Sequence, residues 1–430
     1  MTHPKRVWNG PKTTTDSKQL KWNIMINIGE LLVEDIHRPF ISLWLRLTEN
    51  YPLFQAVEQT SLDDMNRHKE VKESVINLLM ENPPLISATN IDTKFPLAIL
   101  EALDEFLDFD KGTREDSPTA MKELYGKTYL VYRRVRRIHY KIRHVQQTGH
   151  IRSYLRHHWI IPEEIHGIKI SVTKIPAYLP VANFFEKKKI KSFIGSFTDG
   201  ITPLWNKEHL PDYRAETLTD KEERWEGIQD LLHEAIKTKA DILVLPELTV
   251  CQDLRERVAL WLDENSHPFY LVLPGSFHQS SCGEYYNYGE LLNMRGKPVL
   301  SHRKLTTFGE PGEREKITTG ATIHLLDTPI GLIAMPICLD FCEESSPFAD
   351  LWQIIGADWH LVPAYGGKEN ISAHNKRAAG LNRAHGAMTV LSNQPVTLNE
   401  GSSNHHGFAY FSGNSTNISP KSRCISMDLE

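Results

Sequence analysis

The spacing of hydrophobic positions changes near Gly167 and divides the chain into two regions. Before this point apolar residues recur three and four positions apart, as over 70–80, which is typical of amphipathic helices. After it, residues 168–173 alternate apolar and polar side chains, as expected for a strand with one buried face. The pattern predicts a disordered lead-in over 1–16, a mostly α-helical accessory domain over 17–166, and a second domain over 167–430.

The second region consists of short apolar runs separated by helical stretches. The sequence Thr219-Asp-Lys-Glu222 is typical of a capping box and predicts that a helix begins there. Two more helices are predicted over 345–355 and 370–385. Because wholly apolar strands that alternate with helices form sheets covered on both faces, this region predicts an α/β layered domain. The apolar runs lie at 242–245, 270–273, 332–335, 360–362 and 388–391.

A basic segment precedes the change in pattern. Between Leu124 and Pro162 the chain has nine Lys or Arg residues and no Asp or Glu. Val and Ile residues over 131–145 are spaced four, three, four and three apart, which predicts a helix from about Tyr125 to Val145 with one narrow apolar stripe. Clustered arginines can neutralise phosphates, so this helix could bind nucleic acid or an acidic partner. The alternative is a solvated basic face on a packed helix. The candidate binding residues are Arg133, Arg134, Arg136 and Arg137.

Composition adds limits to the possible functions. The 430 residues are 40% hydrophobic and 24% charged, with a formal net charge of −5, which is typical of a soluble globular protein. No apolar run approaches the roughly 20 residues that span a bilayer. Five cysteines without metal-ligand spacing indicate a reducing, cytoplasmic setting. The pairs His157-His158 and His405-His406 have no acidic or Cys ligand at metal spacing, so no metal or cofactor is expected.

Three reactive residues each follow a short apolar run. Glu247 is a candidate general base, Lys304 a candidate electrostatic stabiliser, and Cys338 a candidate nucleophile. Each alone also fits a plainer interpretation: a loop carboxylate, a surface lysine and a buried core cysteine. Because strand ends gather the active site in α/β folds, the three together predict acyl transfer through a thioester. Cys342 fits either a packed core residue or a redox partner.

These segments resemble the nitrilase family of carbon–nitrogen hydrolases over about 168–419. The resemblance implies an αββα sandwich and thiol-dependent hydrolysis of an amide, which is favoured over a nitrile. It also implies that Glu247 takes the thiol proton, and that Lys304 and the backbone N–H after Cys338 stabilise the oxyanion. A second glutamate that orients the substrate is implied as well, with Glu313 favoured and Glu310 as its rival. The motifs that carry the resemblance are Leu243-Val-Leu-Pro-Glu247, His302-Arg-Lys304, Ile337-Cys-Leu-Asp340, Arg383-Ala384 and Gly413-Asn-Ser415.

The resemblance also suggests partners. A small amide or nitrile would be the substrate, and the helices predicted over 345–355 and 370–385 would form the two-fold interface of a homodimer or a larger homo-oligomer. Nitrilase-like domains accompany reverse-transcriptase-type defence proteins in some bacteria. The resemblance therefore implies an alternative: a module for assembly or nucleic-acid-linked defence, in which the basic helix binds nucleic acid or an acidic protein.

Overall fold

The chain folds into two compact units, Met1–Gly112 and Thr113–Glu430. Within the described residues no helix is long and apolar enough to cross a membrane. The lead-in predicted over 1–16 lies outside the described residues. The computed structural model describes residues 36–49, 62–81, 96–109, 120–124, 126–134, 155, 157–175, 189–197, 203–205, 212–218, 220–310, 313–345, 348–395, 406–418 and 423–428.

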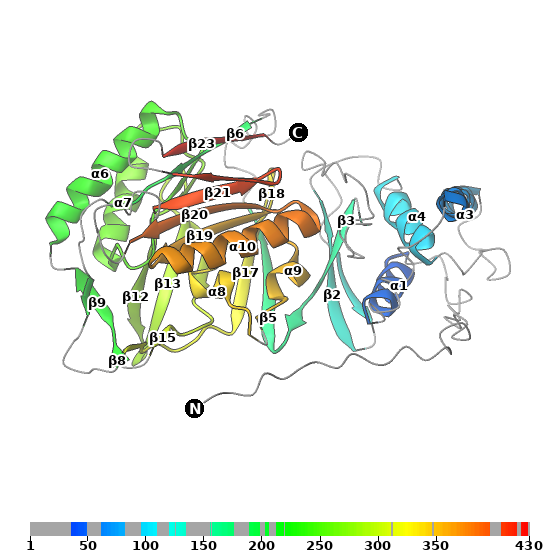
Figure 1. Cartoon of the computed structure of the whole chain (residues 1–430), viewed down its shortest axis with the longest axis horizontal. Helices are drawn as coiled ribbons and strands as arrows, with labels where there is room; N and C mark the ends of the chain where they lie inside the picture. The colour runs from blue at the N-terminus through cyan, green and yellow to red at the C-terminus, as the bar shows by residue number, and fades with distance from the viewer. Residues whose placement is uncertain are drawn as a thin grey trace. The chain divides into compact units, whose positions relative to one another are not determined.

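The described part of the first unit is helical, with α1 at His37–Glu49, α3 at Leu62–Glu81 and α4 at Pro96–Phe109 (Figure 1). The helix predicted over 70–80 is confirmed within α3. Pro96 is the first residue of α4, where its missing N–H has no intrahelical acceptor to lose. The Lys72 Nζ atom lies 2.6 Å from a Glu105 carboxylate oxygen and ties α3 to α4.

A small antiparallel sheet opens the second unit and corrects the predicted basic helix. Its strands are β1 (Ala120–Leu124), β2 (Lys127–Arg133) and β3 (His158–Pro162), in that order. The helix prediction is therefore wrong over 127–133, and residues 135–145 lie outside the described part. Strand β2 is rich in aromatic and β-branched residues. It pairs with β1 in a local hairpin and with β3 on its other edge, and the local spacing does not reveal this second, long-range pairing.

Two larger sheets form the body of the second unit (Figure 1). The seven-stranded sheet has the order β12-β13-β11-β10-β6-β23, with β14 paired to β13. Its strands are β12 Ser276–Ser281, β13 Glu284–Asn293, β11 Leu271–Leu273, β10 Ile242–Val244, β6 Lys189–Ile194, β23 Cys424–Asp428 and β14 Pro298–Arg303.

The eight-stranded sheet has the order β22-β21-β20-β19-β18-β17-β5-β4. Each apolar run predicted as a strand lies in or overlaps a strand of one of the two sheets. The strands are β22 Asn414–Asn417, β21 Gly407–Phe411, β20 Met388–Gln394, β19 Trp359–Tyr365, β18 Gly331–Ala334, β17 Thr322–Thr328, β5 Ile168–Lys174 and β4 Glu164–Ile165. Two smaller sheets join β15 (Gly309–Glu310), β16 (Glu313–Glu315) and β8 (Asp212–Tyr213), and β7 (Pro203–Trp205) with β9 (Ala215–Leu218).

Three apolar clusters show that these elements form four layers. One cluster lies between the sheets and contains Ile242 and Val244 of β10. The alternate residues Leu243 and Leu245 face a second cluster with the helices α6 (Lys221–Lys237) and α7 (Gln252–Glu264). A third cluster joins the eight-stranded sheet to α8 (Leu339–Cys342), α9 (Leu351–Ile355) and α10 (Lys368–His385). The predicted αββα sandwich is confirmed.

Helix α6 confirms one prediction. The helix begins at Lys221 and buries Ile228, Leu231 and Leu232 as its spacing predicts. Its N-cap residue is Asp220, which makes no side-chain capping hydrogen bond. Thr219, the first residue of the predicted capping box, lies outside the described residues, so the capping box stays a prediction.

Candidate active site

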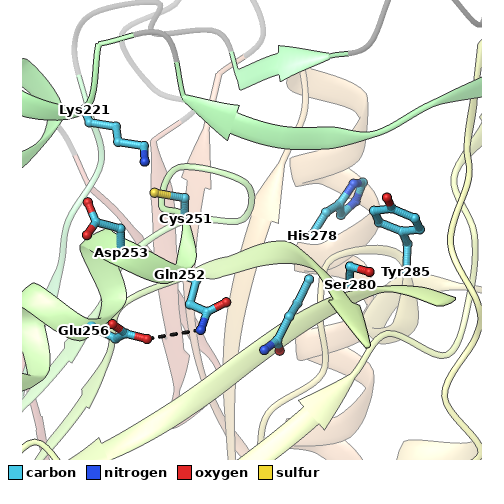
Figure 2. A pocket seen from close by; sticks show the side chains of 9 residues that line it. Lys221, Cys251, Gln252, Asp253, Glu256, His278, Ser280 and Tyr285 are labelled. Carbon is cyan, nitrogen blue, oxygen red and sulfur yellow. Dashed lines mark hydrogen bonds between the residues drawn. The ribbon is translucent and has the colours of Figure 1, made fainter. Parts of the chain in front are cut away.

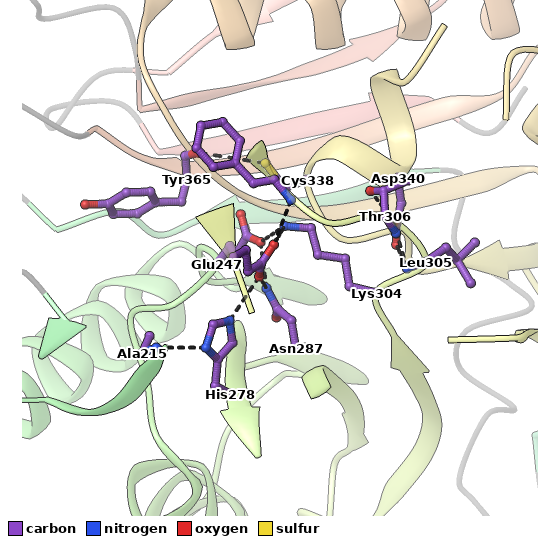
Figure 3. A network of polar contacts seen from close by, with 12 residues as sticks. Ala215, Glu247, His278, Asn287, Lys304, Leu305, Thr306, Cys338, Asp340 and Tyr365 are labelled. Carbon is purple, nitrogen blue, oxygen red and sulfur yellow. Dashed lines mark hydrogen bonds and ion pairs between the residues drawn. The ribbon is translucent and has the colours of Figure 1, made fainter. Parts of the chain in front are cut away.

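The two sheets deliver the three predicted residues to one place (Figure 3). Glu247 follows β10, and its N–H donates to the Ala364 carbonyl of β19 across the sandwich at 3.3 Å. Lys304 directly follows β14. Cys338 follows β18, and its N–H donates to the Pro363 carbonyl at 2.9 Å. Because β18 and β19 are parallel, their carboxyl ends meet at the same edge of the sheet.

Two buried donors bridge two buried carboxylates at this site. The Lys304 ammonium donates to Glu247 Oε1 at 2.9 Å and to Glu315 Oε2 at 2.8 Å. The Asn287 amide donates to Glu247 Oε1 and to Glu315 Oε1, both at 2.8 Å. All four residues are at most 3% exposed. The cluster therefore carries two carboxylates and one ammonium, shielded from water.

The opposite charges of the cluster keep one another ionised despite their burial. Burial alone would lower the pKa of Lys304, but Glu247 and Glu315 together raise that pKa well above its usual value. Burial alone would raise the pKa of Glu315, yet Lys304 and His278 bring it well below its usual value. Lys304 is therefore a permanent cation and Glu315 a permanent anion at neutral pH.

The thiol of Cys338 is held in a strained turn beside this cluster. Its backbone φ is +45°, a conformation that residues other than glycine rarely adopt and that often marks functional sites. The thiol donates to the Tyr365 carbonyl across 3.7 Å and accepts from the Asn370 amide across 3.6 Å. Burial, with a further contribution from Glu247, raises the pKa of the thiol to about 12, while Lys304 acts in the opposite direction. The resting group is therefore a thiol that needs a base.

Asp340 links the lysine to the cysteine turn. Its carboxylate accepts the backbone N–H groups of Leu305 and Thr306 at 2.9 Å, and the Thr306 hydroxyl at 2.8 Å. It also contacts His302 Nε2 at 2.9 Å. One buried side chain, two residues after Cys338, thus fixes the backbone that follows Lys304. The sequence places Asp340 and His302 in the two motifs but gives no sign that they touch.

The second glutamate was not placed by the sequence. Glu315 contacts Lys304, whereas Glu313 was favoured and Glu310 was its rival. Both Glu310 and Glu313 lie in short strands, but their side chains are outside the described residues, so their predicted role stays a prediction. Glu313 and Glu315 are two residues apart, so the alternation expected of a strand places both on the same face. The residue pattern therefore does not show which of them is the second glutamate. The pairing of β16 with β8 and the bond from Glu315 N–H to the Phe308 carbonyl settle the position of Glu315.

The predicted basic residues do not form one exposed group. Arg134 donates to the His385 carbonyl at 3.0 Å and lies 3.7 Å from Asp358, with its side chain only 11% exposed. Arg133 lies half-buried in β2. Arg136 and Arg137 lie outside the described residues. Arg134 is thus a packing residue, and a nucleic-acid role for the others stays a prediction.

A pocket of about 540 Å³ opens near this site, between the first turns of α6 and α7 and the hairpin of β12 and β13 (Figure 2). Its lining is largely polar and includes Lys221, Asp253, Gln279 and Tyr285. His278 is the one lining residue that also belongs to the carboxylate network. Glu247, Lys304 and Cys338 do not line this pocket, so it is separate from the reacting groups.

Comparison with known proteins agrees with this geometry. Residues 211–342 match the family of carbon–nitrogen hydrolases, and the matched segment contains Glu247, Lys304 and Cys338. The match covers less than a third of the chain, and it shows similarity to carbon–nitrogen hydrolases over that segment. No match to a curated protein sequence is found.

Several solved structures are similar to the chain. Nit3 of Saccharomyces cerevisiae, from branch 10 of the nitrilase superfamily, is 17% identical with a TM-score of 0.42, covering 57% of this chain and 92% of that one. A carbon–nitrogen hydrolase from Helicobacter pylori is 15% identical with a TM-score of 0.42, covering 56% and 90%. A variant of the amidase from Nesterenkonia is 14% identical with a TM-score of 0.44, covering 57% and 94%.

Proposed function

We propose that the chain hydrolyses the carbon–nitrogen bond of a small amide through a thioester on Cys338. The observation that carries the proposal is the Lys304 ammonium shared by two buried carboxylates beside a buried thiol. A base, a cation and a nucleophile in one water-shielded site are the groups that acyl transfer requires. An amide is favoured over a nitrile by the family resemblance.

The first half of the reaction forms the thioester. Glu247 Oε1 accepts hydrogen bonds from Lys304 and Asn287, which leaves Oε2 for the thiol proton. The Cys338 sulfur attacks the amide carbon, and the carbonyl oxygen becomes an oxyanion. Lys304 and the N–H of Leu339, the first residue of α8, would stabilise that oxyanion. The carbon–nitrogen bond then breaks, and the proton held by Glu247 moves to the nitrogen, which leaves as ammonia.

The second half returns the enzyme to its starting state. Glu247 takes a proton from a water molecule, and the resulting hydroxide adds to the thioester carbon. The carbon–sulfur bond breaks to release the carboxylic acid, and the proton returns to the sulfur. The high pKa of the free thiol makes it a poor leaving group as a bare thiolate, so this proton return matters. One amide and one water thus become one acid and one ammonia.

Glu315 has a distinct part in this scheme. If Lys304 contacted Glu247 alone, the ion pair would weaken Glu247 as a base, because the proton would have to compete with the ammonium. The second bond from Lys304 to Glu315 divides the ammonium between two carboxylates. Glu315 therefore takes the place foreseen for a second glutamate, and we propose that it also orients the substrate through Lys304.

The test is ammonia release from a panel of small aliphatic and amino-acid amides by the full-length chain. Cys338→Ala removes the nucleophile and little volume, and should reduce turnover by about 10³-fold or more. Glu247→Gln should act similarly, because an amide cannot accept the thiol proton. Cys282→Ala is the matched control, since Cys282 is an exposed thiol. Turnover near that of the unmodified chain in Cys338→Ala would exclude the thioester mechanism.

A further inference from the structure

The geometry points to His278 as a positioning residue that holds Glu315 in one orientation and thereby keeps Lys304 shared between two carboxylates. Neither the family motifs nor the sequence patterns single out this histidine. The inference rests on the proposed roles of Glu247, Lys304 and Cys338. It goes beyond them because His278 touches none of the reacting atoms and acts only through Glu315.

The tautomer of His278 is fixed by the backbone. The Ala215 N–H donates to His278 Nδ1 at 2.8 Å, so Nδ1 must present its lone pair. The ring proton therefore lies on Nε2, which donates to Glu315 Oε1 at 3.0 Å. Both side chains are fully buried.

The fold brings the two partners of His278, Ala215 and Glu315, together from distant parts of the sequence; Figure 3 shows the contact with Ala215. Strand β8 pairs with β16, which carries Glu315, and Ala215 follows β8 at the start of β9. The segment over 212–215 therefore positions the carboxylate and also sets the tautomer of the histidine that contacts it. His278 lies where the network and the pocket meet, because it contacts Glu315 and also lines the pocket beside α7 (Figure 2).

The donor from His278 completes the hydrogen bonding of Glu315. Oε1 accepts from His278 and Asn287, and Oε2 accepts from Lys304 and from the Phe308 N–H at 3.1 Å. Each carboxylate oxygen thus has two donors, which leaves one stable orientation. Without His278, Oε1 keeps only the Asn287 amide, which Glu247 also uses. Glu315 then holds Lys304 less well, and the ammonium shifts toward Glu247.

Three substitutions of His278 test the donor at Nε2 and the acceptor at Nδ1 separately. His278→Gln keeps a donor near the position of Nε2. His278→Asn keeps an acceptor near the position of Nδ1 but is too short to reach Glu315. His278→Phe keeps the ring and neither polar atom. The matched control is His233→Asn, at an exposed position of α6 outside the network.

The readout is the rate at which iodoacetamide alkylates Cys338 in the full-length chain at pH 7.5, followed by peptide mass. Alkylation requires the thiolate, so the rate reports how well the cluster removes the proton, whether or not an amide substrate is known. His278→Gln should stay within about threefold of the unmodified chain. His278→Asn and His278→Phe should be slower by about 10- to 100-fold, the range expected for a lost hydrogen bond to a buried charge. Equal losses in the Gln and Asn variants would overturn the inference.

A coupling test covers the case in which a variant folds poorly. If His278 acts through Glu315, then His278→Asn combined with Glu315→Gln should alkylate no more slowly than Glu315→Gln alone. Losses that multiply would show that His278 acts by another route and would overturn the inference. If His278→Phe fails to fold, the comparison of the Gln and Asn variants decides. An absence of ammonia release with the expected alkylation pattern would contradict the proposed function and leave the positioning role intact.

Discussion

Buried ionisable residues in this chain avoid an unpaired buried charge in two different ways. Lys304 and Glu315 stay charged because each opposite charge is held at hydrogen-bond distance. His360 of β19 is buried just as deeply, beside the rings of Phe341 and Trp352. Within the described residues neither of its ring nitrogens has a hydrogen-bond partner. Burial accordingly lowers the pKa of His360 to about 3, so this residue stays neutral instead.

This depressed pKa predicts an acid-sensitive contribution to stability. Below pH 6.5 the unfolded chain protonates His360 while the folded chain does not, so the free energy of unfolding falls as the pH drops from 6.5 toward about 3. One such group changes the free energy of unfolding by at most about 1.4 kcal/mol per pH unit. His360→Leu should remove this slope, measured by urea unfolding at pH 7.0, 6.0 and 5.0. Identical slopes in the variant and the unmodified chain would contradict the assignment.

At the scale of elements, one glycine joins the small three-stranded sheet to the sandwich. Gly356 ends α9 in the left-handed conformation, at φ +64°. A Cβ atom there would lie 2.0 Å from the Trp159 ring of β3. Trp159 also donates from its indole nitrogen to the Ile354 carbonyl at 3.3 Å. The position therefore requires glycine for two independent reasons, conformation and close approach.

Gly356→Ala should lower the free energy of unfolding by about 2–4 kcal/mol, from the left-handed backbone and the overpacked ring together. Gly380→Ala is the matched control, because Gly380 lies inside α10 and an added Cβ would meet nothing within 4 Å. That change should stabilise the chain by up to about 1 kcal/mol. Urea unfolding of both variants checks the opposite signs. Equal effects would mean that the contact with Trp159 is not rigid.

The elements also show how far the sequence could predict this protein. Wholly apolar runs such as 242–245 predicted buried strands well, because burial on both faces leaves a strong local signature. The strand at 127–133 was missed, since its pairing with β3 joins segments that lie far apart in the sequence. Glu315 and His278 were missed for the same reason. Their contacts depend on how β8, β12 and β16 come together, and no residue spacing records that.

At the scale of the whole molecule, one argument for the predicted dimer does not hold. The apolar residues that suggested an interface over 345–355 and 370–385 are used inside the chain. Trp352 and Ile355 of α9, and Ala378 of α10, are fully buried against the eight-stranded sheet. A dimer through these helices would have to use their outer, more polar faces. The prediction therefore rests on the family resemblance alone.

We still expect a two-fold homodimer, as the resemblance implies. Sedimentation velocity of the full-length chain over a hundredfold range of concentration should show a dimer at the higher concentrations. Lys376 and Glu344 form an exposed ion pair, 2.8 Å between charged atoms, on the outer side of α10. Reversing Lys376 to Glu should weaken association if this face is the interface. A monomer at every concentration would refute the prediction.

The cross-sheet position of Asp340 has a consequence for any partly folded state of this protein. The base and the cation come from the seven-stranded sheet, the thiol comes from the eight-stranded sheet, and Asp340 connects their loops. A compact state that kept both sheets but loosened the packing between them would retain most of its secondary structure. In that state the thiol would be separated from its base. Amide hydrolysis therefore belongs only to the fully docked protein, and loss of ammonia release without a change in circular dichroism would report partly undocked forms.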